Sequence, residues 1–483
     1  MLAIWDRLPN IKKIVVFDRY YPTNLPNVLS LEHFLELGRD YEEKHPNKFE
    51  EIIFTSQPDD LISFTYTSGT TGNPKAGMYT SRNIIASARY LPEAINVKGD
   101  DFYVCFLPLA HIAERLIGHF IRFFSGHPAA FAESIEDMPQ NIRQTGPTVV
   151  FGTPRVWEKF YARIMTGVGD GTWLQKKIFH WAVNVGKTNY EIKETGKKPS
   201  VWLKARLSIA RFLIHDKIKD IFGGRIRTIL TGAAPISKEI IRFFNWVGLD
   251  VYEAYGMTET SGVITVQSEG KTKIGSVGIP IPGTEIKIME DGEICCRGEQ
   301  NIQGYYKNEE ATNELLKPDG KGGFWLHTGD VGHIDEEGYL FITDRKKDII
   351  ITAGGKNVAP QNIENLMKTS PYISQAMVYG DKKPYLTMLV TMDEDEITKF
   401  ARDQKIMYQD LGDLTKKEEV IKLINHVVKE KNKELASYES IKKFRILEEE
   451  LDQDKDEVTP TLKVKRKVVT AHNQDLLDGM YVS

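Results

Sequence analysis

The most informative stretch of this 483-residue sequence reads Tyr66-Thr67-Ser68-Gly69-Thr70-Thr71-Gly72-Asn73-Pro74-Lys75-Ala76-Gly77. It follows the β-branched and aromatic run at 61–64, which predicts a strand. Glycines and hydroxyl residues can direct backbone N–H groups and hydroxyls towards a polyphosphate, and a lysine adds positive charge. We therefore predict a phosphate-binding loop, for which the alternative is a flexible surface turn. Asn73 and Pro74 separate Gly72 from Lys75, so the stretch lacks the Walker ending and disfavours an ordinary P-loop ATPase.

Around this loop, short β-branched runs alternate with helical periodicity, which is typical of an α/β fold. Strands are predicted at 148–151, 227–230 and 348–351. Between 237 and 247 the apolar residues recur with helical spacing, and Ser237 is a candidate N-cap. The sequence therefore predicts a strand, a Gly-rich turn and a helix in succession between 227 and 247.

Two further runs are predicted to lie at the ends of strands. They read Thr231-Gly232-Ala233-Ala234-Pro235 and Tyr252-Glu253-Ala254-Tyr255-Gly256-Met257-Thr258-Glu259-Thr260. Ligands bind outside the carboxyl ends of strands in open α/β sheets, where small residues admit a flat base and an aromatic ring can stack on it. Tyr255 is the stacking candidate. Glu259 is a candidate Mg²⁺ ligand, because this ion prefers carboxylate and phosphate oxygens; capping of a helix N-terminus is the alternative.

Polar residues nearer the C-terminus complete the candidate set. Asp330 can accept two hydroxyl hydrogen bonds from a ribose, and Arg345 can fork onto the same sugar, although each also fits a surface turn. The basic run at 459–467 alternates lysines with valine and leucine, which predicts an ordered strand or turn. The alternative for that run is a basic tail that acts as a nuclear address or a nucleic-acid patch.

The pattern divides the chain into a large and a small domain. We predict a large domain at 1–343 with a β-rich part near 274–340, a hinge at the charged run 344–350, and a small α/β domain at 351–483. The helical stretch from 174 to 220 holds about 11 Lys and Arg against 4 Asp and Glu. For that stretch a solvated face is favoured over a membrane-surface patch.

Composition excludes several classes of protein. A hydrophobic fraction of 41% supports a large core and excludes a disordered chain. The 63 Lys and Arg against 67 Asp and Glu give a net charge of −4, so no nucleic-acid partner is implied. Three cysteines are too few for a disulfide framework or a zinc site and suit a reducing cytosol. No run approaches the ~20 apolar residues of a membrane span, which predicts a soluble, cytoplasmic protein.

Taken in order, six runs resemble the adenylate-forming superfamily of acyl-CoA synthetases, luciferases and peptide-synthetase adenylation domains. They lie at 66–77, 231–235, 252–260, 327–330, 344–350 and 459–467. The runs at 107–115 and 344–360 are similar to the long-chain fatty acyl-CoA synthetase branch, and the resemblance covers about residues 60 to 470. It implies an α/β large domain with a β-rich subdomain, a hinge and a small mobile C-terminal α/β domain. It also implies ATP, Mg²⁺ and CoA as cofactor and co-substrates and a long-chain fatty acid as substrate.

The resemblance also implies roles for individual positions. The positions implied to contact ATP and CoA are Thr67, Ser68, Gly69, Thr70, Thr71, Gly72 and Lys75 at the β- and γ-phosphates, Gly232, Ala233, Ala234, Glu253, Ala254, Tyr255 and Gly256 at adenine, Asp330 and Arg345 at ribose, and Gly354, Gly355 and Lys356 in the loop of thioester formation. Thr258 and Glu259 are implied at the α-phosphate, with Glu259 as the metal ligand. Lys463 is implied beside the α-phosphate during adenylation, and His111 beside the acyl pocket.

The expected activity is therefore that of an AMP-forming long-chain fatty acid–CoA ligase. Two alternatives are an acyl-AMP ligase that loads a carrier protein and a non-catalytic nucleotide- or acyl-binding remnant. Members of this branch usually have a longer segment before the phosphate loop, so the sequence resembles an N-terminally shortened synthetase. A peripheral membrane contact and a homodimer are both left open.

Overall fold

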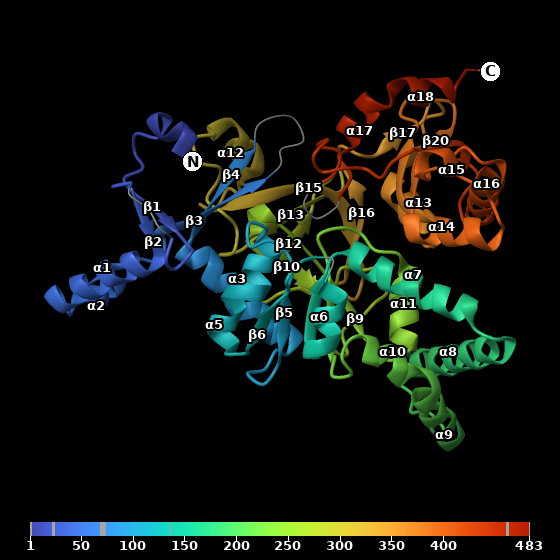
Figure 1. Cartoon of the computed structure of the whole chain (residues 1–483), viewed down its shortest axis with the longest axis horizontal. Coiled ribbons are helices and arrows are strands. Elements are labelled where there is room, and N and C mark those ends of the chain that lie inside the picture. The colour runs from blue at the N-terminus through green and yellow to red at the C-terminus, as the bar shows by residue number, and fades with distance from the viewer. Residues whose placement is uncertain (1, 22–24, 68–73, 136, 460–462, 483) are drawn as a thin grey trace. The chain divides into compact units, whose positions relative to one another are not determined.

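The computed structural model describes residues 2–21, 25–67, 74–135, 137–459 and 463–482, and the chain divides into two compact units, 1–60 and 61–483 (Figure 1). The first unit contains a two-stranded parallel sheet in which Ile14 pairs with Val28. Its elements are the 3₁₀-helix η1 (Leu2–Arg7), β1 (Ile14–Val16), β2 (Val28–Ser30), α1 (Leu31–Lys44) and α2 (Lys48–Thr55).

The second unit is built around a seven-stranded sheet with the order β11-β10-β9-β8-β7-β5-β6. Strands β9, β8, β7, β5 and β6 are parallel, whereas β10 and β11 join antiparallel at one edge. The strands are β5 (Tyr103–Cys105), β6 (Ala129–Phe131), β7 (Val149–Gly152), β8 (Thr228–Thr231), β9 (Val251–Met257), β10 (Gly262–Val266) and β11 (Ile279–Pro280).

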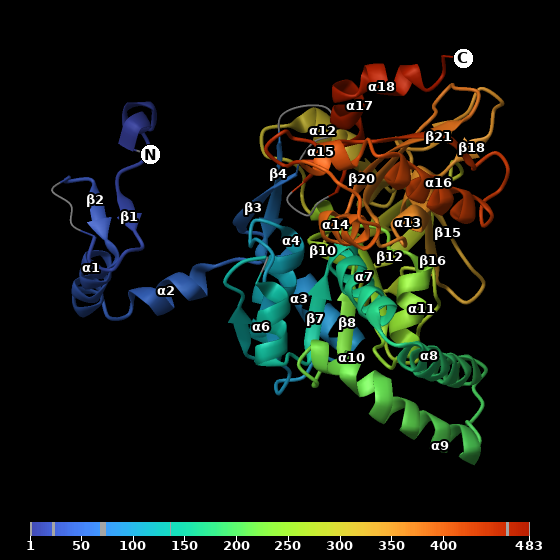
Figure 2. The same cartoon turned by 45° about the vertical axis from the view of Figure 1, so that its right-hand side comes forward.

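Helices surround this sheet, and α8 and α9 extend away from it as an arm in both views (Figures 1 and 2). Two π-helical turns, η2 and η3, are continuous with α-helices. The helices are α3 (Ser81–Ile95), α4 (Ile112–Glu114), η2 (Arg115–Phe120), α5 (Ile121–Ser125), α6 (Met138–Thr145), α7 (Pro154–Asp170), α8 (Trp173–Glu194), α9 (Val201–Ala210), η3 (Arg211–His215), α10 (Asp216–Ile221) and α11 (Lys238–Trp246).

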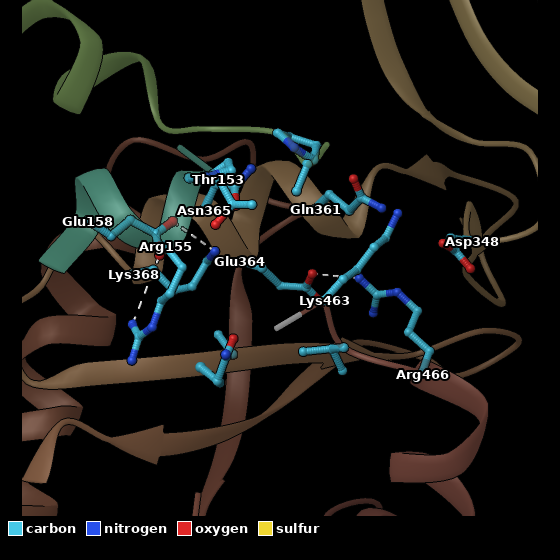
Figure 3. A pocket seen from close by; sticks show the side chains of 16 residues that line it. Thr153, Arg155, Glu158, Asp348, Gln361, Glu364, Asn365, Lys368, Lys463 and Arg466 are labelled. Atoms are coloured by element: carbon cyan, nitrogen blue, oxygen red, sulfur yellow. Dashed lines mark hydrogen bonds and ion pairs between the residues drawn. The ribbon is translucent and has the colours of Figure 1, made fainter. Parts of the chain in front are cut away.

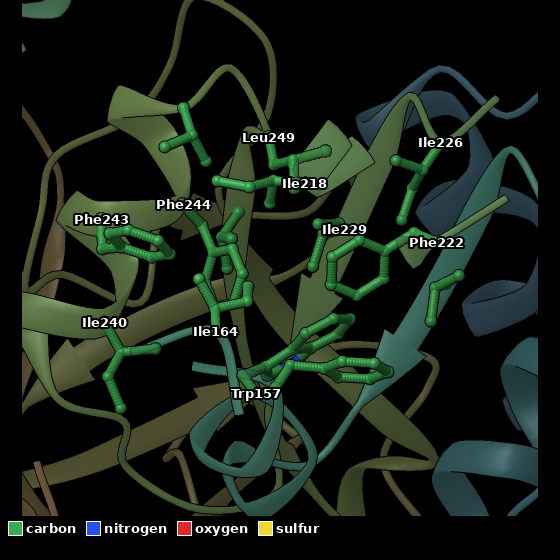
Figure 4. Close-up of a cluster of buried hydrophobic side chains, with 14 of the residues drawn as sticks. Trp157, Ile164, Ile218, Phe222, Ile226, Ile229, Ile240, Phe243, Phe244 and Leu249 are labelled. Atoms are coloured by element: carbon green, nitrogen blue, oxygen red, sulfur yellow. The ribbon is translucent and has the colours of Figure 1, made fainter. Parts of the chain in front are cut away.

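An aromatic cluster packs these helices onto the sheet (Figure 4). Trp157 of α7 is fully buried against Phe222 and Phe244, with ring centroids 6.2 Å apart in both pairs. Its indole N–H donates to the carbonyl of Gly152 at 3.1 Å. A Cβ on Gly152 would lie 2.9 Å from the indole ring, so only glycine lets α7 approach the end of β7 this closely.

Two smaller sheets flank the nucleotide-binding candidates. The hairpin of β3 (Leu61–Thr67) and β4 (Lys75–Thr80) spans the predicted phosphate loop. An antiparallel sheet with the order β12-β13-β15-β14, in which β16 also pairs with β15, occupies much of the predicted β-rich stretch. Its elements are β12 (Glu285–Ile288), β13 (Glu293–Arg297), α12 (Glu309–Leu315), β14 (Leu316–Pro318), β15 (Phe324–Ile334) and β16 (Leu340–Arg345).

The C-terminal part of this unit has its own sheet, in which β19 and β20 are antiparallel and β20 and β21 are parallel. Its elements are β17 (Ile350–Ile351), β18 (Asn357–Val358), α13 (Pro360–Met367), β19 (Ile373–Tyr379), β20 (Leu386–Met392), α14 (Glu394–Asp403), α15 (Leu411–Leu414), α16 (Glu418–Asn432), β21 (Ile441–Ile446), α17 (Arg466–His472) and α18 (Gln474–Gly479). Among the described residues, every buried apolar cluster lies wholly before 344 or wholly after 349.

Polar contacts join the parts before and after that boundary. The carbonyl of Ser374 accepts from Arg155 Nη1 at 2.8 Å, and Lys368 Nζ lies 2.9 Å from Glu158 Oε1. Thr166 donates to Glu396 at 2.6 Å. These contacts between the two parts are hydrogen bonds and an ion pair, and among the described residues no buried apolar cluster spans the boundary.

The predicted fold class is confirmed: both parts mix helices with sheets, and the larger one carries the antiparallel sheet described above. Ser237 caps α11, since its hydroxyl accepts from the N–H of Glu239. The run at 252–260, predicted to lie at the end of a strand, contains most of β9, which extends through Met257, and the following 3₁₀ turn η4 (Thr258–Thr260). The strand predicted at 348–351 is shorter, covering Ile350–Ile351.

Candidate active site

The ends of β8 and β9 lie in direct contact. A Cβ on Gly232, just after β8, would lie 2.7 Å from the carbonyl oxygen of Ala254 in β9. Ala233 takes a positive φ of 69°, which turns the chain sharply after the strand. The predicted adenine-pocket residues Gly232, Ala233, Ala234 and the 253–256 stretch are thus brought together. Gly256 is equally constrained, since its Cβ would lie 1.7 Å from the carbonyl oxygen of Gly262.

The two predicted ribose contacts form a cross-strand pair. Asp330 of β15 is opposite Arg345 of β16, and the arginine Nε lies 3.3 Å from Oδ1 of the carboxylate. The buried Tyr255 donates its hydroxyl to the other oxygen, Oδ2, at 2.7 Å. Burial raises the pKa of Tyr255 well above its ordinary value, so this hydroxyl remains a donor. The carboxylate of Asp330 is therefore held in one orientation from two sides.

The base of the phosphate-loop hairpin meets the turn that carries Thr258 and Glu259. Tyr305 donates to Oε1 of the buried Glu259 at 2.5 Å, and Lys75 Nζ lies 5.3 Å from the centre of the Tyr305 ring. On the hairpin itself, Tyr79 donates to the carbonyl of Thr258 at 2.7 Å. Thr67 and Lys75 face each other across the hairpin. Of the predicted phosphate and metal residues, those that the structure describes (Thr67, Lys75, Thr258 and Glu259) therefore lie close together.

Glu253 of β9 is a buried carboxyl without an ion-pair partner among the described residues. Its Oε2 makes no hydrogen bond in the described part of the chain. Burial raises its pKa to about 8, and the charge of Lys238 only partly opposes this effect. The raised pKa favours the neutral carboxyl near pH 7, in which form Glu253 can donate a hydrogen bond.

Lys463 approaches this site from the C-terminal part of the chain. It lines a cleft together with Ala234, Pro235, Asp348 and Arg466, on the opposite side from α7 (Figure 3). The charges that affect its ammonium are those of Arg345, Asp330, Asp348 and Arg466. Burial, followed by the repulsion of Arg345, lowers the pKa of Lys463 to about 8. Lys463 therefore lies close enough to Asp330 and Arg345 for their charges to affect its ammonium, on the cleft that it shares with Ala234 and Pro235.

A buried ion pair supports the segment that carries Lys463. Arg466 Nη2 lies 2.5 Å from Glu364 Oε2, and its Nη1 donates to the carbonyl of Val378 at 3.1 Å. The other oxygen of Glu364 accepts from the N–H of Val378 at 2.6 Å. These contacts anchor the start of α17 to α13 and β19, three residues after Lys463 (Figure 3).

His111 lies in another environment. Its Nδ1 accepts from the N–H of Ala113 at 3.2 Å, so the side chain caps α4. Burial lowers its pKa, which keeps the imidazole neutral near pH 7. The next turn holds Glu114, a fully buried carboxyl whose pKa burial raises to about 7.

The predicted thioester loop is separate from the nucleotide candidates. Gly354, Gly355 and Lys356 lie between β17 and β18, and Gly355 has a φ of 72°. The loop contacts its own domain: the N–H of Ala353 donates to Lys383, and Lys356 Nζ lies 6.0 Å from the ring of Tyr438. Among the described residues no hydrogen bond joins this loop to Asp330 or Glu259. The predicted loop residues Ser68, Gly69, Thr70, Thr71 and Gly72 lie outside the described residues.

Comparison with known proteins agrees with this arrangement. The model of the AMP-binding enzyme family matches residues 22–306, which is more than half of the chain. This chain belongs to the AMP-binding enzyme family. The C-terminal domain model of the same family matches residues 347–483. The resemblance to adenylate-forming enzymes is thereby confirmed.

Relatives within the family are named as ligases. The long-chain-fatty-acid–CoA ligase FadD15 of Mycobacterium bovis is 38% identical over 87% of this chain and 69% of its own length. The human long-chain-fatty-acid–CoA ligase ACSBG1 is 32% identical over all of this chain and 69% of its own length. A solved adenylation domain of a carboxylate reductase from Mycobacterium chelonae shares the fold, with a TM-score of 0.66, 23% identity, and coverage of 88% of this chain and 61% of that one.

Sequence reasoning missed several residues of this candidate site. Tyr79 and Tyr305 connect the loop hairpin to the 258–260 turn, and Glu364 and Arg466 support Lys463. Only Arg466 lies inside a stretch singled out from the sequence, the basic run at 459–467. The described part of the chain contains no helix long and apolar enough to cross a bilayer.

Proposed function

We propose that this protein is an AMP-forming ligase that activates a long-chain fatty acid with ATP and transfers the acyl group to CoA. The first half-reaction gives acyl-AMP and pyrophosphate, and the second gives the thioester and AMP. The names of the relatives support the substrate class, since two ligases for long-chain fatty acids match most or all of this chain.

The observation that carries the proposal is the convergence of three separate segments. Lys463 lies in the field of the Asp330–Arg345 pair, and Tyr255 connects that pair to β9. Glu259 and Lys75 lie against Tyr305 at the base of the loop hairpin. In this set, the Asp330 carboxylate can accept hydrogen bonds from the hydroxyl groups of a ribose. The lysine cations suit a polyphosphate, and the carboxylate of Glu259 suits its metal ion.

Adenylation needs charge stabilisation and no protein nucleophile. The fatty-acid carboxylate oxygen forms a bond to the α-phosphorus while the bond from that phosphorus to the bridging oxygen of pyrophosphate breaks. Lys463 would stabilise charge on the α-phosphate, and Lys75 with the loop hairpin would hold the departing phosphates. Asp330 would fix the ribose, because Tyr255 and Arg345 already hold its carboxylate in place.

Mg²⁺ fits the donor set at Glu259. In the described residues no three His, Cys, Asp or Glu side chains could together hold a metal, so an ion there would take most of its ligands from phosphates and water. Glu259 offers one carboxylate, which Tyr305 orients through Oε1. When bound, the ion would neutralise phosphate charge during adenylation.

Thioester formation requires other groups at the same anhydride. The thiol of CoA loses its proton, its sulfur bonds to the acyl carbon, and the bond from that carbon to AMP breaks. We propose that residues 344–350 act as a hinge between domains 1–343 and 351–483, and that rotation brings Gly354, Gly355 and Lys356 in and takes Lys463 out. The polar contacts across the domain boundary support this, because breaking them exposes no apolar core.

The test measures pyrophosphate release from ATP and Mg²⁺ with palmitate, in the presence and absence of CoA. Palmitate-dependent release followed by CoA-dependent thioester formation supports the ligase. Release without any response to CoA would instead identify an acyl-AMP ligase that loads a carrier protein. Binding of ATP without release would overturn the proposal in favour of a nucleotide-binding protein.

A further inference from the structure

The arm formed by α8 and α9 presents apolar side chains to the outside. Val201, Trp202, Ile209 and Phe212 are 81%, 83%, 53% and 76% exposed. Ala205 between them is exposed as well. An exposed tryptophan and phenylalanine on one short segment differ from the single apolar residues that are scattered over most protein surfaces.

These residues share one side of the continuous helix formed by α9 and η3. At 3.6 residues per turn, positions 201, 202, 205, 209 and 212 fall within about 100° of the helix circumference. The opposite side, which includes Leu203, Leu207 and Ala210, packs on Ala182 and Val185 of α8. The helix is therefore apolar on two sides. Within the described chain, one side packs against α8 and the other is exposed to solvent.

Cations border the outward side. Lys204 and Arg211 lie on one flank of the apolar stripe, and Arg206 on the other. In the described structure no hydrogen bond or ion pair engages the side chain of Lys204 or Arg206. The whole stretch from 174 to 220 carries 11 Lys and Arg against 4 Asp and Glu. An excess of unpaired cations around an apolar stripe is complementary to a surface that is both anionic and apolar.

We propose that this outward face of α9 and η3 docks the protein on an anionic lipid bilayer, with the helix lying in the interface. Trp202 and Phe212 would enter the boundary between headgroups and acyl chains, while the flanking lysine and arginine side chains reach the lipid phosphates. Both aromatic anchors are exposed, and the helix that carries them belongs to the arm that extends away from the sheet (Figures 1 and 2). For the stretch 174–220 the sequence favoured a solvated face over a membrane-surface patch; our proposal takes the second alternative for α9 and η3.

The test uses the full chain and unilamellar vesicles, one set of phosphatidylcholine and one of phosphatidylcholine mixed equally with phosphatidylglycerol. Co-sedimentation gives the partition coefficient. The wild-type protein should bind the anionic vesicles at least about tenfold more strongly than the neutral ones, and added salt should weaken this binding. The double substitutions Trp202→Ser/Phe212→Ser and Lys204→Glu/Arg206→Glu should each reduce binding about tenfold or more.

Matched controls change exposed residues elsewhere. Phe123→Ser removes a 73% exposed phenylalanine on α5, and Lys321→Glu/Lys442→Glu reverses two exposed lysines away from the arm. Both controls should retain vesicle binding. Equal loss in the controls, or equal binding of wild type to neutral and anionic vesicles, would overturn the proposal. So would a dimer that dissociates on Trp202→Ser/Phe212→Ser, because the face would then serve a second copy of the chain.

This inference is independent of the proposed ligase activity, and the two can fail separately. Pyrophosphate release is measured without vesicles, where the arm variants should match wild type. A protein that binds anionic vesicles but releases no pyrophosphate retains the docking face and loses the proposed function. A protein that releases pyrophosphate but does not bind anionic vesicles would retain the proposed function and overturn the docking proposal.

Discussion

Replacing Lys463 by methionine should lower activity and raise stability at the same time. The pKa of this lysine falls from 10.5 to about 8 in the folded protein. A difference of about 2.5 pKa units corresponds to about 3 kcal/mol, which solvent contact of the partly exposed side chain reduces to about 1–3 kcal/mol. Burial thus makes this cation unfavourable in the folded protein, and methionine removes the charge while keeping a similar side-chain length. Loss of one preorganised cation should slow acyl-AMP formation about 10²- to 10³-fold.

The sign of the pH effect follows from the direction of the shift. Between pH 8 and about 10.4 the unfolded chain binds this proton and the folded chain releases it, so the wild-type free energy of unfolding rises with pH in that window. The advantage of Lys463→Met is therefore complete below pH 8 and is lost as the pH rises towards 10.4. In wild type, kcat/KM for ATP in adenylation should fall above pH 8, and the variant should lack this limb.

Calorimetry of the nucleotide-free protein gives the melting temperature, and single-turnover assays separate the half-reactions. The variant should melt a few degrees higher at pH 7. It should form thioester from supplied palmitoyl-AMP at nearly the wild-type rate, whereas Lys467→Met, which changes an exposed neighbour, should alter neither property. A lower melting temperature, or equal loss of both half-reactions, would refute the reasoning.

Three further substitutions test other parts of the site. Tyr255→Phe leaves Oδ2 of Asp330 without its donor and should reduce kcat/KM for ATP about tenfold, as measured from initial rates at varied ATP; an unchanged value would argue against this role. Glu253→Gln should keep wild-type ATP affinity at pH 7 by titration calorimetry, because the native carboxyl is already neutral there. Its stability advantage in urea unfolding should widen from pH 4.5 to 8, since the folded wild type retains a proton that its unfolded chain releases, and a constant gap would contradict the raised pKa. Lys368→Ala removes the partner of buried Glu158 at the domain boundary, and should slow acyl-AMP formation while sparing thioester formation from palmitoyl-AMP; equal slowing of both would count against rotation.

Local patterns predicted the framework of this protein well. The N-cap at Ser237 and the buried strands β7 and β8 follow from neighbouring residues, and such signals act over a few positions. Asp330 and Arg345 were predicted to contact the same ribose, but their direct contact with each other was not predicted. Their pairing comes from the register of β15 against β16, which the turn between these strands sets.

Contacts between distant segments could not be predicted from the sequence. Tyr79 donates to Thr258 across 179 positions, and Tyr305 reaches Glu259 across 46. From the sequence alone, a tyrosine in an apolar stretch is usually interpreted as a residue of the hydrophobic core. Only the packing of the loop hairpin against the 258–260 turn gives these two hydroxyls their acceptors. The same holds for the pKa of Glu253, since the burial that raises it depends on the packing around β9.

The confinement of each apolar cluster to one side of residue 344 has a consequence for energy coupling. Because reorientation would exchange polar contacts for water, the two orientations need differ by only a few kcal/mol, and neither is locked. A ligand whose affinity differs about 100-fold between them shifts their ratio about 100-fold, which is about 2.7 kcal/mol. Adenylation removes pyrophosphate, and with it negative charge, from the proposed site near Lys463. Under the proposed hinge at 344–350, the chemical step would itself bias the choice between the two orientations, without a separate trigger.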